Sequence, residues 1–598
     1  MNETQRKVRN ILEDYFGPGF DERLEQAFEP VDLRGGDWLF REGEAGDSLY
    51  FLVRGRLQAW SGEGRSARLL GEIVPGDSVG EAGLLSGAPR SAGVRAIRDS
   101  FLVRLGQAPF EALSSRHPGM VMKLAARVAE LMQRNILGTG HSQRAYSTIC
   151  LVRVGASQRV HDSTEALAAS LCRDRRGLAL GRRRLDAAGA PDRLESDGSL
   201  GEGLRSWLAD REDEHDVLLY LCDAEDSAWT RFALRQSDLT LWMADAEASP
   251  IPGAAERALE PAGAQALVLH HPAGAEIRDT GVWLESRHVD FHLHLREDHA
   301  EDRQRLERVL RGQAIGLVLG AGAVRGLSEL GVYQAMVELG VPVDWVGGSS
   351  IGSIVAGAIA RGWDPEHAIA MARESFVGGK PFSDYTVPVI SLIRGKRMVR
   401  LLRKHLDVDI EDLPIPYFCV SSRLDRGEVH VHERGNLVEA IRASAALPGV
   451  LPPAVVDSEL VVDGAVLNNL PVDIMLRQPV GPVIAVDVSF QGARKVDFDE
   501  TPSSWAVLRG RFLPFAERYR VPSLATLILR ATEIGTLVQS RQRGAAADLL
   551  ITPDVRQFRM TDVKAFDAIV EKGYEAGRES LAAWLESRNA TDGTRDLS

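Results

Sequence analysis

A glycine-flanked pair of serines is the first feature of this sequence that could do chemistry. Residues 348–352 read Gly348-Ser349-Ser350-Ile351-Gly352 and fit the pattern G-x-S-x-G. They follow an apolar segment typical of a strand and precede a run of small residues typical of a helix. This order produces the sharp turn that exposes a nucleophilic serine. Ser350 is therefore the candidate nucleophile, and Gly348 and Gly352 are the candidate turn glycines.

A nucleophilic serine needs a base, because a neutral hydroxyl is a weak nucleophile. Asp463 directly follows the apolar run ELVV and precedes Gly464, so a strand would present its carboxylate at the edge of a sheet. An aspartate before glycine is also common in ordinary turns. The histidines beyond the serine motif lie in charged sequence typical of the surface, namely His367, His405, His430 and His432. Asp463 is therefore the candidate base.

A glycine-rich turn precedes the serine motif, between a predicted strand and a predicted helix within residues 314–340. Backbone N–H groups in such a turn bind anions, either a dinucleotide pyrophosphate or the oxyanion of an acyl-transfer intermediate. The acid that a dinucleotide site would use, Asp344, comes before the apolar end of its strand rather than after it. This favours the oxyanion hole and leaves hydride transfer as an alternative. The candidate oxyanion-hole residues are Gly320, Ala321, Gly322, Ala323, Arg325 and Gly326.

The chain of 598 residues is too long for one hydrophobic core, so we expect several domains. The elements of these domains position the candidate residues named above. Residues 28–105 read as many short strands separated by turns, which is typical of an antiparallel barrel or sandwich. A helical pattern over 108–137 follows. Residues 146–296 alternate apolar strands with polar or helical segments, as in a parallel α/β layer, and contain no G-x-x-x-x-G-K-[ST] string. A charged helix over 296–312 leads into a second α/β region.

The order of three motifs resembles the patatin-like phospholipase family. They are GAGAVRG at 320–326, GSSIG at 348–352 and DGA at 463–465. The strings ASAALPGVLPP (443–453) and NNLPVD (468–473) resemble the neuropathy target esterase branch of that family. The resemblance implies that Ser350 and Asp463 form a catalytic dyad and that the glycine turn forms the oxyanion hole. The branch usually has glycine at positions 321 and 323, where this chain has Ala321 and Ala323, and alanine resists positive φ.

The N-terminal segment resembles cyclic-nucleotide-binding domains over most of residues 26–130. The motifs are GDWLFREGEAGDSLYFLVRGRL (36–57) and GDSVGEAGLLSGAPRSAGVRA (76–96). A fixed guanidinium at Arg90 suits the cyclic phosphate, and Glu81 suits the ribose hydroxyl. The candidate nucleotide-binding residues are Gly80, Glu81, Arg90, Ser91 and Ala92. An α/β segment follows where a transcription factor would have a helix-turn-helix, so DNA binding is not expected.

Together these features predict a multidomain chain. We expect an N-terminal β-barrel or jelly-roll cyclic-nucleotide-binding domain with its exit helix (1–140) and a middle α/β Rossmann-like domain (141–300). The C-terminal α/β patatin-like hydrolase domain (301–598, core 314–487) ends in a helical tail. The predicted function is hydrolysis of carboxylic esters in lysophospholipids or phospholipids, with cyclic AMP or cyclic GMP as an effector and no catalytic cofactor or metal. The alternative is a catalytically silent nucleotide sensor or lipid-binding scaffold.

Composition sets the expected location. The formal charge of −13 argues against a nucleic-acid partner, and four widely spaced cysteines indicate free thiols in a reducing compartment. The charged N-terminus lacks the apolar stretch of a secretory signal, and no segment is typical of a membrane span. We therefore expect a cytoplasmic protein. An apolar run adjoins basic residues in the segment 385–406, which suggests peripheral contact with the inner face of the membrane. The alternative is an ordinary amphipathic helix packed on the core. Nothing in the sequence indicates an oligomeric state.

Overall fold

The computed structural model forms two compact units, Met1–Gly312 and Gln313–Ser598. Each unit is described separately below. The residues that the structure describes are 3–16, 27–62, 68–116, 119, 122–124, 126, 146–174, 176–182, 190, 202–259, 261–489, 500–503, 505–507, 509, 542–559 and 561–595.

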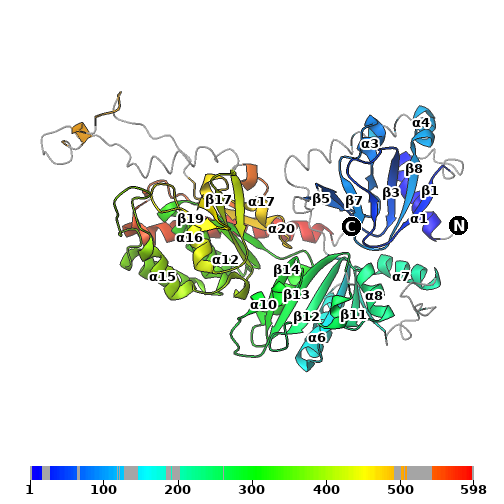
Figure 1. Cartoon of the computed structure of the whole chain (residues 1–598), viewed down its shortest axis with the longest axis horizontal. Helices are drawn as coiled ribbons and strands as arrows, with labels where there is room; N and C mark the ends of the chain where they lie inside the picture. The colour runs from blue at the N-terminus through cyan, green and yellow to red at the C-terminus, as the bar shows by residue number, and fades with distance from the viewer. Residues whose placement is uncertain are drawn as a thin grey trace. The chain divides into compact units, whose positions relative to one another are not determined.

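The first unit begins with two antiparallel four-stranded sheets, drawn in blue in Figure 1. Each sheet buries one apolar face against the other, so short alternating strands suffice. One sheet has the order β1 (Glu29–Leu33), β8 (Ser100–Gly106), β3 (Ser48–Arg54) and β6 (Ser78–Val79). The other has the order β2 (Trp38–Phe40), β7 (Gly93–Ala96), β4 (Leu57–Ser61) and β5 (Arg68–Ile73). The predicted jelly-roll is confirmed.

Among the described residues, the helices beside these sheets are α1 (Glu3–Phe16), α3 (Glu81–Ser86) and α4 (Gln107–Arg116). The first part of the predicted exit helix over 108–137 is α4. Most of its remainder lies outside the described residues.

The second half of the first unit is a parallel six-stranded sheet. Its strands are nearly continuous apolar runs because helices cover a parallel sheet on both faces. Their order is β10 (Gly177–Gly181), β11 (Val217–Asp223), β9 (Thr148–Val154), β12 (Leu239–Asp245), β13 (Ala264–His271) and β14 (Phe291–Arg296). The helices are α6 (Gln158–Asp174), α7 (Glu202–Glu214), α8 (Ala228–Gln236), α9 (Ala254–Arg257), α10 (Thr280–Glu285) and α11 (Ala300–Leu310).

A buried ion-pair network joins the two halves of the first unit. The carboxylate of Asp238, just before β12, lies 3.2 Å from guanidinium nitrogens of both Arg56 and Arg98, which belong to the jelly-roll. Arg98 also pairs with Glu212 of α7. Burial by itself would raise the pKa of Asp238, but the two guanidinium groups hold that pKa below its ordinary value. Removing one partner would strand a buried charge, so the network fixes the contact between the halves.

The second unit is built on a mixed sheet with the order β19-β20-β17-β16-β15-β21-β22, and β18 also pairs with β17. Its central strands are buried on both faces, as their glycine and aliphatic residues require. The strands are β15 (Gly316–Leu319), β16 (Trp345–Ser349), β17 (Tyr417–Arg423), β18 (Glu428–His432), β19 (Ala454–Val456), β20 (Glu459–Asp463), β21 (Val483–Val486) and β22 (Leu549–Ile551).

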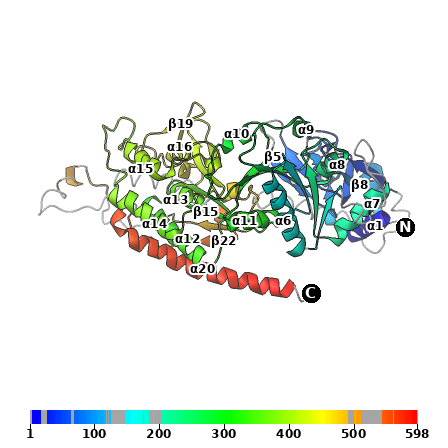
Figure 2. The same cartoon turned by 90° about the horizontal axis from the view of Figure 1, so that it is seen from below.

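The helices of this unit include one long C-terminal helix, α20 (Phe566–Arg595), which lies alongside α12 (Ser328–Glu338) in Figure 2. Glycines bring the two backbones together: a Cβ on Gly331 would lie 2.0 Å from the carbonyl oxygen of Val570, and one on Gly573 would lie 1.7 Å from that of Ser328. The other helices are η2 (Ala323–Leu327), α13 (Ile351–Ala360), α14 (Pro365–Arg373), η3 (Glu374–Gly378), α15 (Lys396–Leu406), η4 (Ile410–Asp412), α16 (Leu437–Ser444), η5 (Gly464–Val466), α17 (Val472–Met475) and η6 (Val563–Ala565).

None of the helices in the described segments combines the length and the apolar composition needed to cross a bilayer.

Candidate active site

Ser350 occupies a strained turn between β16 and α13. Its backbone has φ 54° and ψ −119°, a conformation that a residue with a side chain rarely adopts. The flanking glycines allow the chain to fold back on itself. A Cβ on Gly348 would lie 2.5 Å from backbone atoms of Gly352, and one on Gly352 would lie 2.4 Å from the carbonyl oxygen of Leu319. The turn holds the Ser350 hydroxyl beyond the end of the sheet.

The structure brings Ser350 and Asp463 together. The Ser350 Oγ donates a hydrogen bond of 2.7 Å to the Asp463 Oδ2. Asp463 ends β20, whose antiparallel pairing with β17 sets Asp463 opposite Ser421. Its other carboxylate oxygen accepts the backbone N–H of Ala465 at 2.9 Å. Two hydrogen bonds therefore fix the orientation of this carboxylate toward Ser350.

Burial controls the protonation of Asp463. The side chain is enclosed, and this desolvation raises the pKa of Asp463 to about 6, although hydrogen bonds from Ala465 and Ser350 oppose the rise. A carboxylate with a pKa near neutrality is a better proton acceptor than an exposed one and is still ionised at pH 7. Such a group suits general base catalysis.

Two neighbouring serines differ from Ser350. Ser349 is buried on β16, and its Oγ has no hydrogen-bond partner among the described residues. Ser444, at the end of α16, accepts the backbone N–H of Ser350 at 3.0 Å. Sequence reasoning did not identify Ser444 as a site residue, although it belongs to the string ASAALPG that carries part of the family resemblance.

The histidines of this unit lie elsewhere. The His432 ring bonds the hydroxyl of Ser421, and burial lowers the pKa of His432 to about 3. In the described part of the chain, no histidine ring has a hydrogen bond to Ser350 or to Asp463.

The glycine turn offers fewer free donors than its length suggests. The N–H groups of Gly320 and Ala321 donate to the carbonyl oxygens of Val486 and Asn469. Gly322 and Ala323 follow, and their N–H groups have no acceptor among the described residues. Ala323 has a φ of 51°, so the left-handed conformation considered for this turn occurs at an alanine. Ala321 does not adopt positive φ.

The last two residues of the turn have structural contacts. The buried Arg325 donates through its Nε to the carbonyl oxygen of Phe558 at 3.0 Å. A Cβ on Gly326 would lie 2.2 Å from the side chain of Ile351, so glycine there lets the turn pack against the helix that follows Ser350.

The predicted nucleotide-binding residues gather around Arg90 in the jelly-roll. The buried Arg90 guanidinium donates to the carbonyl oxygen of Gly80 at 3.2 Å and lies over the ring of Phe40 at 4.1 Å. Gly80 has a φ of 97°, and a Cβ there would lie 2.5 Å from Arg90. Glu81 accepts the hydroxyl of Ser78. Ser91 and Ala92 follow Arg90 on the loop that enters β7.

In the parallel sheet of the first unit, an ion pair lies at the position where a phosphate-binding loop would follow the strand. The loop after β9 reads Gly155-Ala156-Ser157, and the Ser157 hydroxyl donates to Asp245 at 2.6 Å. Arg159 pairs with the same carboxylate at 3.0 Å. These contacts occupy the carboxyl ends of β9 and β12, where an open α/β sheet binds ligands.

Three family models match this chain in succession. The cyclic nucleotide-binding domain matches residues 30–117, the P-loop like domain of the Neuropathy Target Esterase family matches residues 145–315, and the patatin-like phospholipase matches residues 317–476. The middle match comes despite the missing G-x-x-x-x-G-K-[ST] string.

Several proteins are similar to this chain over most of its length. An NTE family protein of Mycobacterium tuberculosis is 31% identical, with 94% of each chain covered. Patatin-like phospholipase domain-containing protein 6 of Homo sapiens is 30% identical over 96% of this chain and 46% of its own length. Lysophospholipase NTE1 of Mycosarcoma maydis is 28% identical over 96% of this chain and 35% of its own length. The chain thus spans about half the length of the human relative and about a third of the length of the fungal relative. Its match to the mycobacterial protein along nearly the full length of both shows that the chain belongs to the neuropathy target esterase (NTE) family.

Proposed function

We propose that this chain is a serine esterase that hydrolyses carboxylic ester bonds of lysophospholipids or phospholipids. The hydrogen bond of 2.7 Å between the Ser350 Oγ and the Asp463 Oδ2 carries the proposal, because it joins a nucleophile in a strained turn to a buried base. The names of the fungal and human relatives, a lysophospholipase and a patatin-like phospholipase domain protein, support the substrate class.

The reaction follows from this pair. The Ser350 Oγ attacks the ester carbonyl carbon while its proton passes to the Asp463 Oδ2. The tetrahedral intermediate collapses, the alcohol leaves with the proton from Asp463, and the acyl group remains on Ser350. Water then attacks the acyl-enzyme, and Asp463 takes its proton and returns it to Ser350 as the fatty acid departs. The N–H groups of Gly322 and Ala323 are our candidates to stabilise the oxyanion, since those of Gly320 and Ala321 already have carbonyl acceptors.

Substitution of the two adjacent serines tests this assignment. Ser350→Ala should abolish hydrolysis of a p-nitrophenyl ester and labelling by a fluorophosphonate, with the adduct located by mass spectrometry. Ser349→Ala is the matched control, because the buried Ser349 hydroxyl has no described partner to lose and its removal should leave both readouts largely intact. The reverse pattern would contradict the choice of nucleophile. Folded wild-type protein that neither turns over esters nor labels would instead support the silent lipid-binding scaffold.

The remaining parts of the proposal concern control and location. The match to a cyclic nucleotide-binding domain and the buried Arg90 support cyclic AMP or cyclic GMP as an effector. We also expect the chain to act in the cytoplasm, because its four widely spaced cysteines favour a reducing compartment. Since phospholipid substrates reside in membranes, we expect peripheral contact between the patatin-like unit and the membrane surface.

A further inference from the structure

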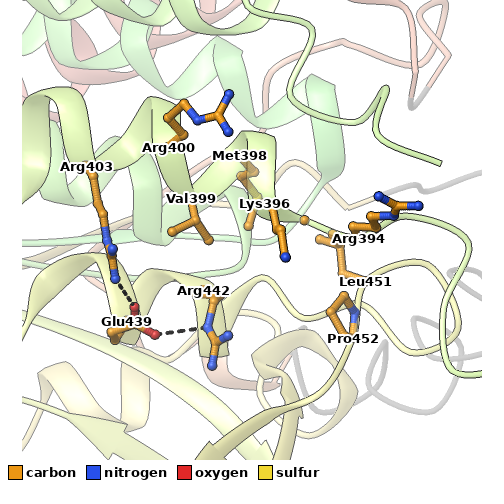
Figure 3. A pocket seen from close by; sticks show the side chains of 11 residues that line it. Arg394, Lys396, Met398, Val399, Arg400, Arg403, Glu439, Arg442, Leu451 and Pro452 are labelled. Atoms are coloured by element: carbon orange, nitrogen blue, oxygen red, sulfur yellow. Dashed lines mark hydrogen bonds and ion pairs between the residues drawn. The ribbon is translucent and has the colours of Figure 1, made fainter. Parts of the chain in front are cut away.

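A cavity of about 490 Å³ opens between α15 and α16, and neither Ser350 nor Asp463 lines it. Figure 3 shows Lys396 and Arg403 of α15 on the side of α16, where Arg403 and Arg442 both meet Glu439, while the guanidinium of Arg400 points away from Arg442. Its volume is in the range of small-molecule binding sites. The charged residues of its lining are Arg394, Lys396, Arg400, Arg403, Arg442 and Glu439.

The positive charge of this cavity is only partly compensated. Glu439 pairs with Arg403 at 3.0 Å and with Arg442 at 3.1 Å. Arg394, Lys396 and Arg400 have no carboxylate partner within the described part of the chain. Five basic groups against one carboxylate leave four formal positive charges around one cavity. Such a cluster of ammonium and guanidinium groups fits a phosphate, which accepts several charge-assisted hydrogen bonds at once.

A hairpin over residues 384–394, which has an apolar tip, leads directly into the cavity. Its stem is closed by backbone hydrogen bonds from Arg394 N–H to the Asp384 carbonyl at 2.9 Å and from Thr386 N–H to the Leu392 carbonyl at 3.1 Å. Its tip is exposed: 76% of Val387, 85% of Val389 and 71% of Ile390 are accessible to solvent. Arg394, at the end of the hairpin, already lines the cavity. The ordered stem therefore holds apolar side chains next to cations.

The hairpin is also tied to the candidate active site by one short segment. Leu392 and Ile393 donate through their N–H groups to the carbonyl oxygens of Gly449 and Val450. Three residues before Gly449, the carbonyl oxygen of Ala446 accepts the backbone N–H of Asp463 at 3.0 Å. A surface that binds through the hairpin would thus be held at a defined position relative to the serine.

We infer that the hairpin tip and the cavity together form a docking surface for an anionic lipid bilayer. The apolar tip enters the boundary between headgroups and acyl chains, and the cavity takes the phosphate of a lipid headgroup that is not the ester being cleaved. Apolar side chains beside Lys and Arg are the combination that binds anionic membrane surfaces. The inference rests on the proposed function, because it explains how a lipid hydrolase would reach its substrate.

Vesicle co-sedimentation of the full chain tests the docking surface. The experiment uses the Ser350→Ala background, so that no lipid is consumed, and compares vesicles of phosphatidylcholine alone with equimolar phosphatidylcholine and phosphatidylglycerol. Arg394→Glu/Arg400→Glu should weaken binding to the anionic vesicles at least about tenfold, since each basic group near a membrane contributes to the attraction. Arg434→Glu/Arg477→Glu makes the same change of charge at exposed arginines outside the cavity and should bind nearly as the background does.

The hairpin tip is tested in the same assay with Val389→Ser/Ile390→Ser, which should also weaken binding to the anionic vesicles. Thermal melting shows whether each variant is folded. Equal binding by the cavity variant and its control, or equal binding to both kinds of vesicle, would overturn the inference. Binding of inorganic phosphate in the cavity without any binding to vesicles would identify a soluble ligand and would overturn it as well. Failure of the proposed function is a separate result: the wild type would bind anionic vesicles and yet hydrolyse no p-nitrophenyl ester.

Discussion

As the proposed base, Asp463 has to satisfy two opposing demands. It must be dry enough to accept a proton readily, and it must remain ionised at the working pH. Burial meets the first demand and raises its pKa to about 6, while hydrogen bonds from Ala465 and Ser350 favour the ionised form and limit the rise. A histidine is not needed when the environment of a carboxylate tunes it in this way.

This protonation predicts the pH dependence of hydrolysis. Below pH 6 a protonated Asp463 cannot accept the serine proton, so kcat/KM for a soluble p-nitrophenyl ester should rise with pH through about 6 and then level off. Asp463→Asn should reduce turnover by about 10⁴-fold or more, because members of such a pair act as a unit. The rate of Ser350→Ala at each pH supplies the background. If the residual activity of Asp463→Asn kept the same acidic limb, another group would be the base.

At the scale of elements, the unit that carries Ser350 and Asp463 contains a close contact between α12 and α20. The helix α12 follows the glycine turn directly, so its position determines where the N–H groups of that turn point. Gly331 and Gly573 allow the two backbones to approach to a distance at which no Cβ fits. Residues far apart in the chain thus support the candidate oxyanion hole through one helix pair.

Adding a single methyl group at this contact tests its importance. Gly573→Ala would place a Cβ 1.7 Å from the carbonyl oxygen of Ser328, so one helix must move, and the free energy of unfolding should fall by about 1 to 3 kcal/mol. Gly378→Ala is the matched control in the same unit, because nothing lies within 4 Å of its Cβ position, and it should change stability by less than about 0.5 kcal/mol. Chemical denaturation measures both. Equal stability of the two variants would show that the helix contact relaxes freely.

At the scale of the whole molecule, one chain combines a nucleotide-binding domain, an α/β layer and a hydrolase-like unit. Within the first unit, the buried network of Asp238 with Arg56 and Arg98 resists sliding between the jelly-roll and the parallel sheet. This contact offers a physical connection between the jelly-roll and the parallel sheet.

We accordingly predict that cyclic AMP or cyclic GMP shifts the affinity for a lipid ester. A coupling free energy of roughly 1–3 kcal/mol would change the affinity for the lipid ester by about 5- to 150-fold. A bound lipid analogue would shift the affinity for the nucleotide by the same factor. Arg90→Ala should weaken nucleotide binding, since it removes the guanidinium that would meet the cyclic phosphate. Calorimetric titration measures nucleotide binding, and hydrolysis of vesicle lipid measures its effect on the esterase reaction. Tight nucleotide binding without any change in hydrolysis would rule out control by this domain.

Much of the organisation was predictable from local patterns. Short alternating strands predicted the jelly-roll, and largely apolar segments such as LTLWMA (239–244) and ALVL (266–269) predicted the parallel layer. The string G-x-S-x-G between a strand and a helix made Ser350 the candidate nucleophile, because a strained turn of this kind has a local sequence signature. Asp463 could be proposed for the same reason, since a strand end before glycine is also a local feature.

Other properties depend on contacts between distant segments, which no local pattern encodes. Packing decided that Val486 and Asn469 occupy the N–H groups of Gly320 and Ala321, that Ser444 holds the backbone of Ser350, and that Asp463 is dry enough for a pKa of about 6. The sequence showed a basic segment at 385–406, but Arg442 joins it only because α16 packs beside α15. The sequence by itself thus determined the elements and the reactive residue types. Tertiary structure alone decided which donors remain free and which charges share a cavity, because burial and proximity are properties of the packed chain.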